Sequence, residues 1–452
     1  MNAETNAPTR SRERSGLLLD ALNFLLADVR GVLGPYLNVF LVTQQGWSQS
    51  SVGVMTTIGG LIGLVVQTPA GAAIDATSAK RGVIVFALAV LAFGSVIIFA
   101  APTFWPVLTA NTVMAVIGDV FGPAVAALTL GIFTRAQLAE RMGRNGAFDH
   151  AGNIAIAVVA GGVGWLFGQR SVFLLVPLFA VFAVGVVLSI PTAAIDQDRA
   201  RGADADAPLR QAPDWRTVFK CRPLMIFSLS ALLFHFANAP LLPLVGQKLA
   251  LANKELATAM MSSCIVAAQL VMLPVALFVG RKADQWGRKR VLLIGFVVLP
   301  VRAFLYTLSN DSIWLLAVQL LDGVGAGIWG VLTPLVVADL MFRTGRYNLA
   351  LGTVATTQGI GASFGGLTAG LMVDHFGYDA AFATSACIAF FAWVVLGLAM
   401  PETAKESELQ ESSGSAKLRD RNFSAGRCQT DHRPRGGRQG GGNGPTFGRY
   451  AG

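Results

Sequence analysis

The stretch Gly280-Arg-Lys-Ala-Asp284-Gln-Trp-Gly287-Arg288-Lys289-Arg290 lies between two long apolar segments. A related stretch, Gly71-Ala-Ala-Ile-Asp75-Ala-Thr-Ser-Ala-Lys80-Arg81, lies 209 residues earlier and also sits between apolar segments. The Gly, the Asp and the closing Lys-Arg pair hold the same relative positions in both stretches. Two equivalent loops at this separation predict two similar halves, arranged as parallel repeats about an axis along the membrane normal.

The composition around these loops is that of a membrane protein. Of the 452 residues, 53% are hydrophobic and 13% are charged, whereas an ordinary soluble domain carries about 25% charged residues. This balance excludes a soluble multidomain enzyme. The apolar residues form segments long enough to cross a bilayer as helices. We predict an all-α membrane protein with twelve transmembrane helices, near 17–43, 51–74, 82–102, 105–134, 143–168, 171–192, 223–248, 256–280, 289–309, 312–342, 347–374 and 378–400.

The longest polar interval between these helices divides them six and six. Residues 193–222 alternate Asp with Arg and contain two prolines, which indicates a flexible linker between two six-helix bundles. The Gly- and Arg-rich segment at the end of the chain has the composition of a disordered tail. The predicted parts are the N-terminal segment 1–16, the first bundle 17–192, the linker 193–222, the second bundle 223–400 and the tail 401–452.

Lys and Arg residues gather on one of the two membrane sides that the predicted helices define. Apart from the tail and two residues inside helices, 21 Lys and Arg fall on the side of the N-terminus and three fall on the other side: Arg170, Lys248 and Lys254. Positive charge collects on the cytoplasmic side of membrane proteins. We therefore expect a multi-pass protein of the bacterial inner membrane with both termini in the cytoplasm. The net charge of +9 follows from this topology and from attraction to anionic lipid, so no nucleic-acid partner is predicted.

The two loops and the twelve helices resemble the major facilitator superfamily. Its loop signature, G-x-x-x-D-[RK]-x-G-R-[RK], follows helices 2 and 8; the copy from Gly280 is close and the copy from Gly71 is degraded. The resemblance covers about residues 17–400 and assigns no subfamily. It implies a secondary transporter working by alternating access, with helices 1, 4, 7 and 10 lining a central cavity. It also implies that the loops hold the two halves together on the cytoplasmic side, through Gly71, Asp75, Arg81, Gly280, Asp284, Gly287, Arg288 and Arg290.

Five charged residues lie deep in predicted helices: Asp28, Arg30, Asp119, Arg302 and Asp322. Each is roughly 15–21 Å from the start of its helix at 1.5 Å per residue, near the middle of a ~30 Å hydrocarbon core. Because a charge there costs at least ~2.5 kcal/mol, these side chains must face a cavity or one another. We predict Asp28, Asp119 and Asp322 as proton-coupling candidates and Arg30 as a solute contact. An interhelical ion pair of Arg30 remains the alternative, and Arg302, on the ninth helix, is interpreted as structural.

Polar side chains form stripes on helices 1, 4, 7 and 10. These stripes coincide with the helices that the resemblance places around the cavity. The predicted solute contacts, besides Arg30, are Asn38, His235, Asn238, Gln319 and Trp329. A hydrogen-bonded core role is equally compatible with His235 taken alone.

The remaining motifs exclude several kinds of chemistry. The sequence has neither HExxH nor GxxxxGK[ST] nor CxxC, so we predict no metal site, no cofactor and no enzyme. Pairs of glycines four residues apart predict close helix packing: Gly118 and Gly122, Gly323 and Gly327, Gly361 and Gly365, and Gly366 and Gly370. The predicted function is secondary transport of a small solute by a monomer in the lipid bilayer, coupled to protons. A membrane-embedded sensor or enzyme is the alternative.

Overall fold

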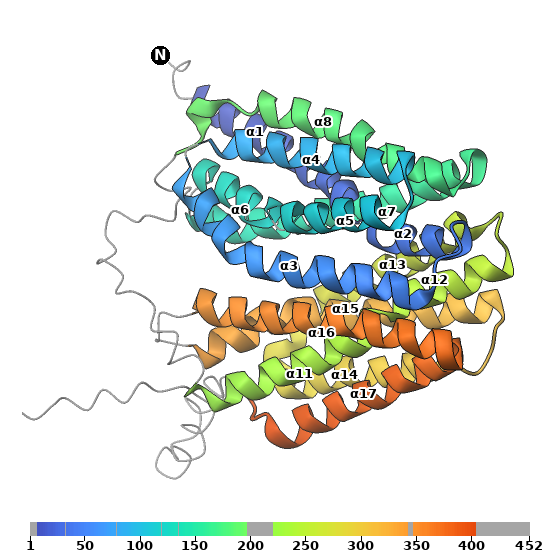
Figure 1. Cartoon of the computed structure of the whole chain (residues 1–452). Coiled ribbons are helices and arrows are strands. Elements are labelled where there is room, and N and C mark those ends of the chain that lie inside the picture. Colours follow the sequence, from blue (N-terminus) through green and yellow to red (C-terminus); the bar gives the residue numbers. More distant parts are fainter. Residues whose placement is uncertain are drawn as a thin grey trace, which may run out of the picture.

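The computed structural model describes residues 7–31, 33–77, 79–118, 120–133, 135–196, 220–341 and 347–403. Over these residues the chain is almost entirely helical, and the long helices run roughly side by side (Figure 1). The prediction of a twelve-helix, two-bundle membrane fold is confirmed.

The first bundle contains eight α-helices that make six spans. They are α1 (Ala7–Gly31), α2 (Leu33–Thr43), α3 (Gln49–Ala76), α4 (Lys80–Ala100), α5 (Phe104–Gly118), α6 (Phe121–Ile132), α7 (Arg135–Phe167) and α8 (Leu175–Ser189). Short 3-10 turns, Gln169–Leu174 and Thr192–Ala194, precede and follow α8.

The second bundle contains seven α-helices that make the other six spans. They are α11 (Arg222–Asn238), α12 (Leu241–Ala252), α13 (Ala257–Trp286), α14 (Arg288–Leu305), α15 (Ser312–Leu340), α16 (Tyr347–Phe376) and α17 (Tyr378–Ala399). The exact limits predicted for the halves and the linker stay predictions, since residues 197–219 and 404–452 lie outside the described part.

Three spans that the sequence predicts as single helices are each covered by two described helices: α1 and α2, α5 and α6, and α11 and α12. Val32 and Asp119, between the first two pairs, lie outside the described residues. Between α11 and α12 the chain makes a turn at Ala239 and Pro240. Because proline has no N–H and clashes with the preceding turn, Pro240 interrupts the helical hydrogen-bond ladder there.

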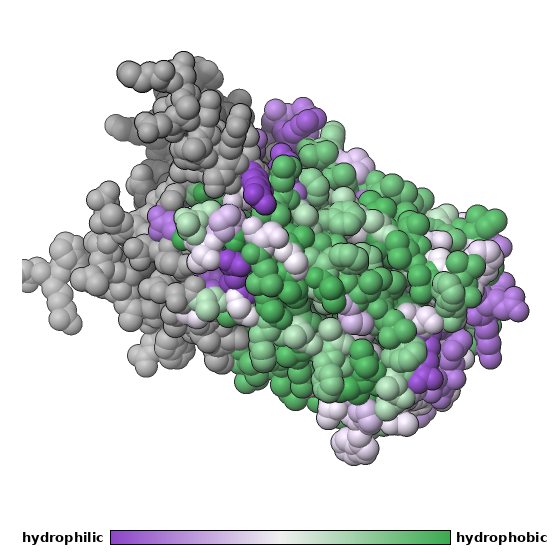
Figure 2. All heavy atoms as spheres, turned by 90° about the horizontal axis from the view of Figure 1, so that it is seen from above, coloured by the Kyte–Doolittle hydropathy of each residue, from purple (hydrophilic) through white to green (hydrophobic). Residues whose placement is uncertain are grey.

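The outer surface suits a lipid environment. In Figure 2 the middle of the described surface is hydrophobic and hydrophilic residues gather toward the two ends. Nine segments among the described residues are long and apolar enough to cross a membrane. Large apolar side chains such as Phe93, Val181 and Leu398 point outward, as lipid-facing residues do. We call the end where α1 begins and α17 ends the termini face, and the end with residues 44–48 and Gly377 the opposite face.

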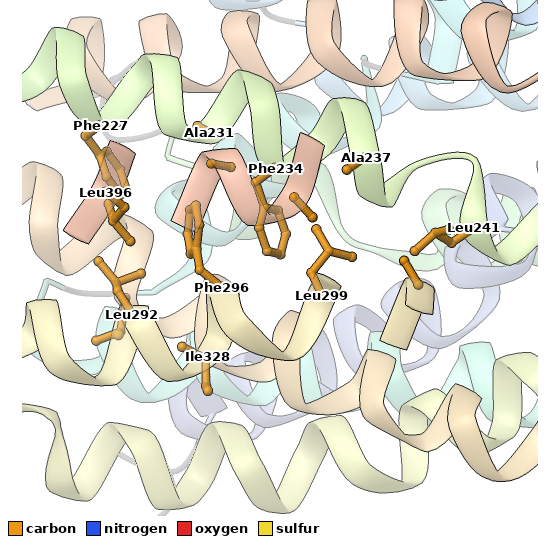
Figure 3. Packing of buried hydrophobic residues seen from close by; sticks show 14 of the residues in the cluster. Phe227, Ala231, Phe234, Ala237, Leu241, Leu292, Phe296, Leu299, Ile328 and Leu396 are labelled. Atoms are coloured by element: carbon orange, nitrogen blue, oxygen red, sulfur yellow. The ribbon is translucent and has the colours of Figure 1, made fainter. Parts of the chain in front are cut away.

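Each bundle has its own apolar core. In the second bundle, Phe227 and Phe234 of α11 pack against Leu292 and Phe296 of α14 (Figure 3). A comparable cluster fills the first bundle. A third, smaller cluster joins the two bundles toward the opposite face and includes Met261 of α13. The bundles are therefore separately packed units that also meet along α2, α3 and α7 of the first bundle and α12, α13 and α16 of the second.

Most of the predicted glycine pairs allow close helix contact. A Cβ atom on Gly361 or Gly365 of α16 would lie 2.1 Å from a backbone oxygen of α11, and one on Gly323 would lie 2.2 Å from an oxygen of α13. The prediction is wrong for Gly118 and Gly122, because a Cβ at either position would meet no described atom within 4 Å. Small size at those two positions leaves space instead of bringing helices together.

Candidate functional site

A buried ion pair lies at the centre of the second bundle. Arg302 of α14 is 2% exposed, and its Nη1 pairs with Oδ1 of Asp322 on α15. Its Nη2 donates to Oδ1 of Asn238, the last residue of α11, at 2.7 Å. One guanidinium thus ties together three helices. Its Nε is buried and has no hydrogen-bond partner, so the cluster keeps one unused donor.

Further polar side chains extend this cluster along α15. Gln319 Nε2 donates to the other carboxylate oxygen of Asp322 at 3.1 Å. The Tyr306 hydroxyl donates in turn to Gln319 Oε1. Both Asp322 oxygens therefore accept hydrogen bonds, which is the arrangement that stabilises an ionised carboxylate away from water.

The ion pair borders a cavity of about 140 Å³. Its lining includes His235 and Asn238 of α11, Arg302 of α14, and Asp322 and Trp329 of α15. At roughly 30 Å³ for each water molecule of liquid, this volume admits a few waters or one group of a larger solute. The cavity can therefore bring a small polar group against both members of the ion pair.

An aromatic wall fixes the imidazole at the edge of this cavity. The Trp329 ring stacks on Phe234 with centroids 5.4 Å apart, and meets the His235 ring edge-on at 5.1 Å. His235 Nδ1 lies 3.0 Å from the Ala231 carbonyl oxygen. Because a carbonyl can only accept, this hydrogen bond requires a proton on Nδ1, which points the other ring nitrogen, Nε2, away from the α11 backbone.

The structure brings together most of the solute contacts predicted in the second bundle. His235, Asn238 and Trp329 line one cavity. Gln319 does not line it, but its side chain donates a hydrogen bond to Asp322, which does. Asn38 instead lines a second cavity, toward the opposite face. Arg302, interpreted from the sequence as structural, pairs with Asp322 and also lines the first cavity. Its structural role stays a prediction.

Several predicted residues lie outside the described side chains. They are Asp28, Arg30, Gly71, Asp75, Asp119 and Asp284. Their predicted roles as proton-coupling, solute-binding or gating residues stay predictions.

The described loop residues make contacts within their own bundle. Arg81 donates to Thr192 Oγ1 at 2.6 Å and to the Leu188 carbonyl at 2.7 Å, both at the end of span 6. Arg288 pairs with Asp339 near the end of α15. Gly287 has φ +85°, a backbone conformation that favours glycine. Gly280 has open space around it and Arg290 is exposed. A role of these residues in joining the halves stays a prediction.

A second ion-pair cluster lies near the termini face of the first bundle. The Asp20 carboxylate on α1 accepts from Arg141 Nη2 at 2.5 Å and from Arg144 Nη2 at 2.7 Å, both on α7. Arg141 Nε also donates to Asn145 Oδ1, and Asn145 Nδ2 reaches Thr129 on α6. Sequence reasoning did not assign a role to Asp20. The signal was its position inside an apolar helix, which demands a basic partner.

The two bundles are tied together toward the opposite face. Asp374 of α16 accepts from the backbone N–H groups of Gln49 and Ser50 on α3, and Gln49 Nε2 donates to the Tyr378 hydroxyl at 2.8 Å. Closer to the middle, Thr57 Oγ1 donates to the Ser363 carbonyl at 2.6 Å. These cross-bundle bonds lie between the middle of the molecule and the opposite face.

This arrangement matches a known family across most of the chain. The profile of the Major Facilitator Superfamily matches residues 19–276 and 224–427. The chain belongs to the major facilitator superfamily. An uncharacterized MFS-type transporter of Mycobacterium tuberculosis (strain ATCC 25618 / H37Rv) is 48% identical over 390 residues, which cover 85% of this chain and 93% of that protein.

Solved structures of transporters share the superfamily fold with this chain. The crystal structure of the nucleoside transporter NupG superposes with a TM-score of 0.69 at 14% identity, covering 85% of this chain and 98% of that one. The D-xylose-proton symporter gives a TM-score of 0.63 at 14% identity, covering 87% and 98%. At these identities the likeness establishes the fold, and the family membership makes the chain a membrane transporter.

Proposed function

We propose that this transporter moves a small solute by alternating access between its two bundles and that protons drive the transport. The observation that carries the proposal is the Arg302–Asp322 pair beside a cavity within the transmembrane region. A charge pair at this depth costs free energy, and membrane proteins keep such groups chiefly for function. The polar side chains that line this cavity, His235, Asn238, Arg302 and Asp322, give a solute hydrogen-bonding partners there.

Asp322 is the proposed proton carrier, and Arg302 controls its protonation. While the pair is intact, the guanidinium favours the ionised carboxylate. A solute group that draws Arg302 away would leave Asp322 in an apolar setting, where the protonated form is favoured. Solute binding and proton binding would then be linked through one arginine. Asp28 and Asp119 remain proposed as further proton sites and Arg30 as a solute contact.

The proposed orientation places the termini face in the cytoplasm of a cell with an inner membrane. It is supported by the 21 basic residues of that side against three on the other. The hydrogen bonds toward the opposite face support a conformation that is closed to the outside. Transport then requires those bonds to break in the second, outward-open state. We further propose that the transporter works as a monomer.

The test is proton movement in vesicles that contain the purified protein and an internal pH dye. Nucleosides, monosaccharides, amino acids and organic cations are added one class at a time. At least one class should change the internal pH with wild-type protein, and Asp322→Asn should remove the change without lowering protein content. A pH change of equal size with Asp322→Asn would contradict the proposed coupling. A membrane-embedded sensor or enzyme would give no solute-dependent pH change with any class.

A further inference from the structure

The two carboxylate oxygens of Asp322 have different partners. Oδ1 pairs with Nη1 of Arg302 on α14, and Oδ2 accepts from Nε2 of Gln319 at 3.1 Å. Gln319 lies three residues before Asp322 on α15, so the two side chains are neighbours on one side of the helix. Among the described residues, Arg302 and Gln319 are the only side-chain partners of Asp322. A proton that binds this carboxylate must therefore displace one of two donors.

The two donors differ in how easily they can be displaced. Arg302 lines the cavity of about 140 Å³ together with Asp322, and its Nη2 also has Asn238 as an acceptor. Gln319 does not line this cavity and is 0% exposed. If a proton took Oδ2, the Gln319 amide would lose its acceptor in a place that neither solute nor water reaches, which is costly. Displacing Arg302 from Oδ1 is therefore the less costly exchange.

Tyr306 fixes the direction of the Gln319 amide. The Tyr306 hydroxyl donates to Oε1 of Gln319, and both side chains are fully buried. Turning the amide by half a rotation would bring Nε2 to the phenol and Oε1 to Asp322. The buried hydroxyl would then lose its acceptor, and Oε1 would face an ionised carboxylate. Tyr306 therefore keeps Nε2 directed at Oδ2.

The other ionisable groups around this chain of hydrogen bonds do not pair with Asp322 in the described structure. His235 of α11 lines the same cavity. Lys248 of α12 lies 3.5 Å from the backbone carbonyl oxygen of Tyr306, and the buried Cys264 of α13 interacts electrostatically with Tyr306. The remaining charged residues of α13 to α16 lie near the ends of those helices. Arg302 is thus the charge that competes with the proton.

We propose that Gln319 is a positioning residue that makes proton binding and the Arg302 pair mutually exclusive at Asp322. Its amide, held by Tyr306, reserves Oδ2, so a proton that arrives through the cavity binds Oδ1, the oxygen that Arg302 occupies. Arg302 keeps its own protons and moves away, and the proton leaves Oδ1 for the cavity when the pair forms again. Without Gln319, a proton would bind Oδ2 while Arg302 stays on Oδ1, and the two events would no longer be linked.

This inference deepens the proposed coupling and rests on Asp322 as the proton carrier, but its first test needs no transport. Infrared difference spectra between high and low pH are recorded on the full-length protein in lipid nanodiscs, with ordinary and with ¹⁵N-labelled arginine. The carboxyl band that disappears in Asp322→Asn reports protonation. The isotope-sensitive guanidinium band that disappears in Arg302→Met reports the ion pair.

In the wild type, the two bands should change together as the pH falls. Gln319→Met keeps the length of the side chain and removes the amide, so Asp322 should become protonated while most of the guanidinium signal stays unchanged. The share of Asp322 that is protonated and still paired should rise about tenfold, which corresponds to about 1.4 kcal/mol. Gln269→Met is the matched control on α13, because the Gln269 side-chain oxygen is buried without a partner; its bands should stay linked.

Tyr306→Phe is the second variant and serves also if Gln319→Met does not fold. It keeps Gln319 but removes the hydroxyl that fixes the amide, so a turned amide can accept from a protonated Oδ2. The link between the two bands should therefore weaken in this variant as well. In vesicles, Gln319→Met should move solute with a smaller pH change than the wild type.

Bands that stay linked in both Gln319→Met and Tyr306→Phe would overturn the inference and leave the proposed coupling standing. Bands that separate equally in Gln269→Met would also overturn it, because the effect would then not depend on the partner of Oδ2. The proposed function fails separately, if Asp322→Asn keeps the full solute-dependent pH change in vesicles.

Discussion

The carboxylate of Asp374 caps the first turn of a helix in the other bundle, with Oδ2 2.7 Å from the backbone nitrogen of Ser50. Oδ1 accepts from the neighbouring nitrogen of Gln49 at 3.0 Å. The first N–H groups of a helix have no partner within it, and a carboxylate there is stabilised by the helix dipole. The cap of α3 thus exists only while the halves are together on the opposite face.

Replacing Asp374 should favour opening on that face. An N-cap is worth about 1 kcal/mol, which changes a two-state ratio by a factor of about 5. Val52 is a buried residue that lines the cavity between the bundles, so a cysteine at this position reports opening. Labelling of Val52→Cys should be about 5 times faster when Asp374→Ala is also present. The measurement uses a membrane-impermeant maleimide on a background without native cysteines. Asp379→Asn is the control, because Asp379 pairs with Lys248 of its own bundle; an equal rise there would contradict the prediction.

Removing one member of the Arg302–Asp322 pair should destabilise the protein more than removing both. A lone buried charge costs about 3–5 kcal/mol, whereas an apolar pair of similar volume is often neutral. Arg302→Met should therefore melt well below wild type, and Arg302→Met with Asp322→Leu should recover most of the loss. The double variant should still fail to move protons. Additive losses in thermal melting would mean that the two side chains do not share one buried pair.

The two arginines that bind Asp20 should differ in their effect on stability. The Arg141 side chain is 6% exposed and also binds Asn145, whereas the Arg144 side chain is 53% exposed. Surface ion pairs contribute about 0–1 kcal/mol, and breaking a buried one costs several times more. Urea or thermal unfolding should show a large loss for Arg141→Met and a small one for Arg144→Met. Equal losses would contradict this ranking.

Glycine replacements should separate contact positions from open ones. Gly365→Ala places a Cβ 2.1 Å from the Phe236 carbonyl oxygen, so α16 and α11 must move apart. Gly122→Ala meets no described atom and gains up to about 1 kcal/mol of helix propensity. The first variant should melt lower than wild type and the second should not. A neutral Gly365→Ala would show that this packing is loose.

The fold could be predicted from the sequence because three of its signals are read along the chain without knowing which helices touch. They are the length of the apolar segments, the side on which Lys and Arg gather, and the repeated loop. The helix break at Pro240 was visible as a proline, but membrane helices often tolerate proline, so its effect depended on packing. His235, Asn238 and Asp322 were found because polar groups inside apolar helices stand out.

Partnerships were harder to predict than positions. Arg302 reaches Asp322 from a helix that contributes no polar stripe, and Asn38 and Gln247 line one cavity between the two halves. Both relations depend on how helices distant in sequence rotate against one another. The spacing of residues along one chain does not contain that information.

The most direct measurement is concentrative transport into vesicles under an imposed pH gradient, with radiolabelled nucleosides, monosaccharides and amino acids. Wild-type protein should accumulate at least one labelled solute above equilibrium on one side, and a protonophore should abolish the accumulation. Asp322→Asn should let the same solute equilibrate without accumulating. Failure of every solute to cross, or accumulation that persists in Asp322→Asn and resists the protonophore, would contradict proton-driven transport by this chain.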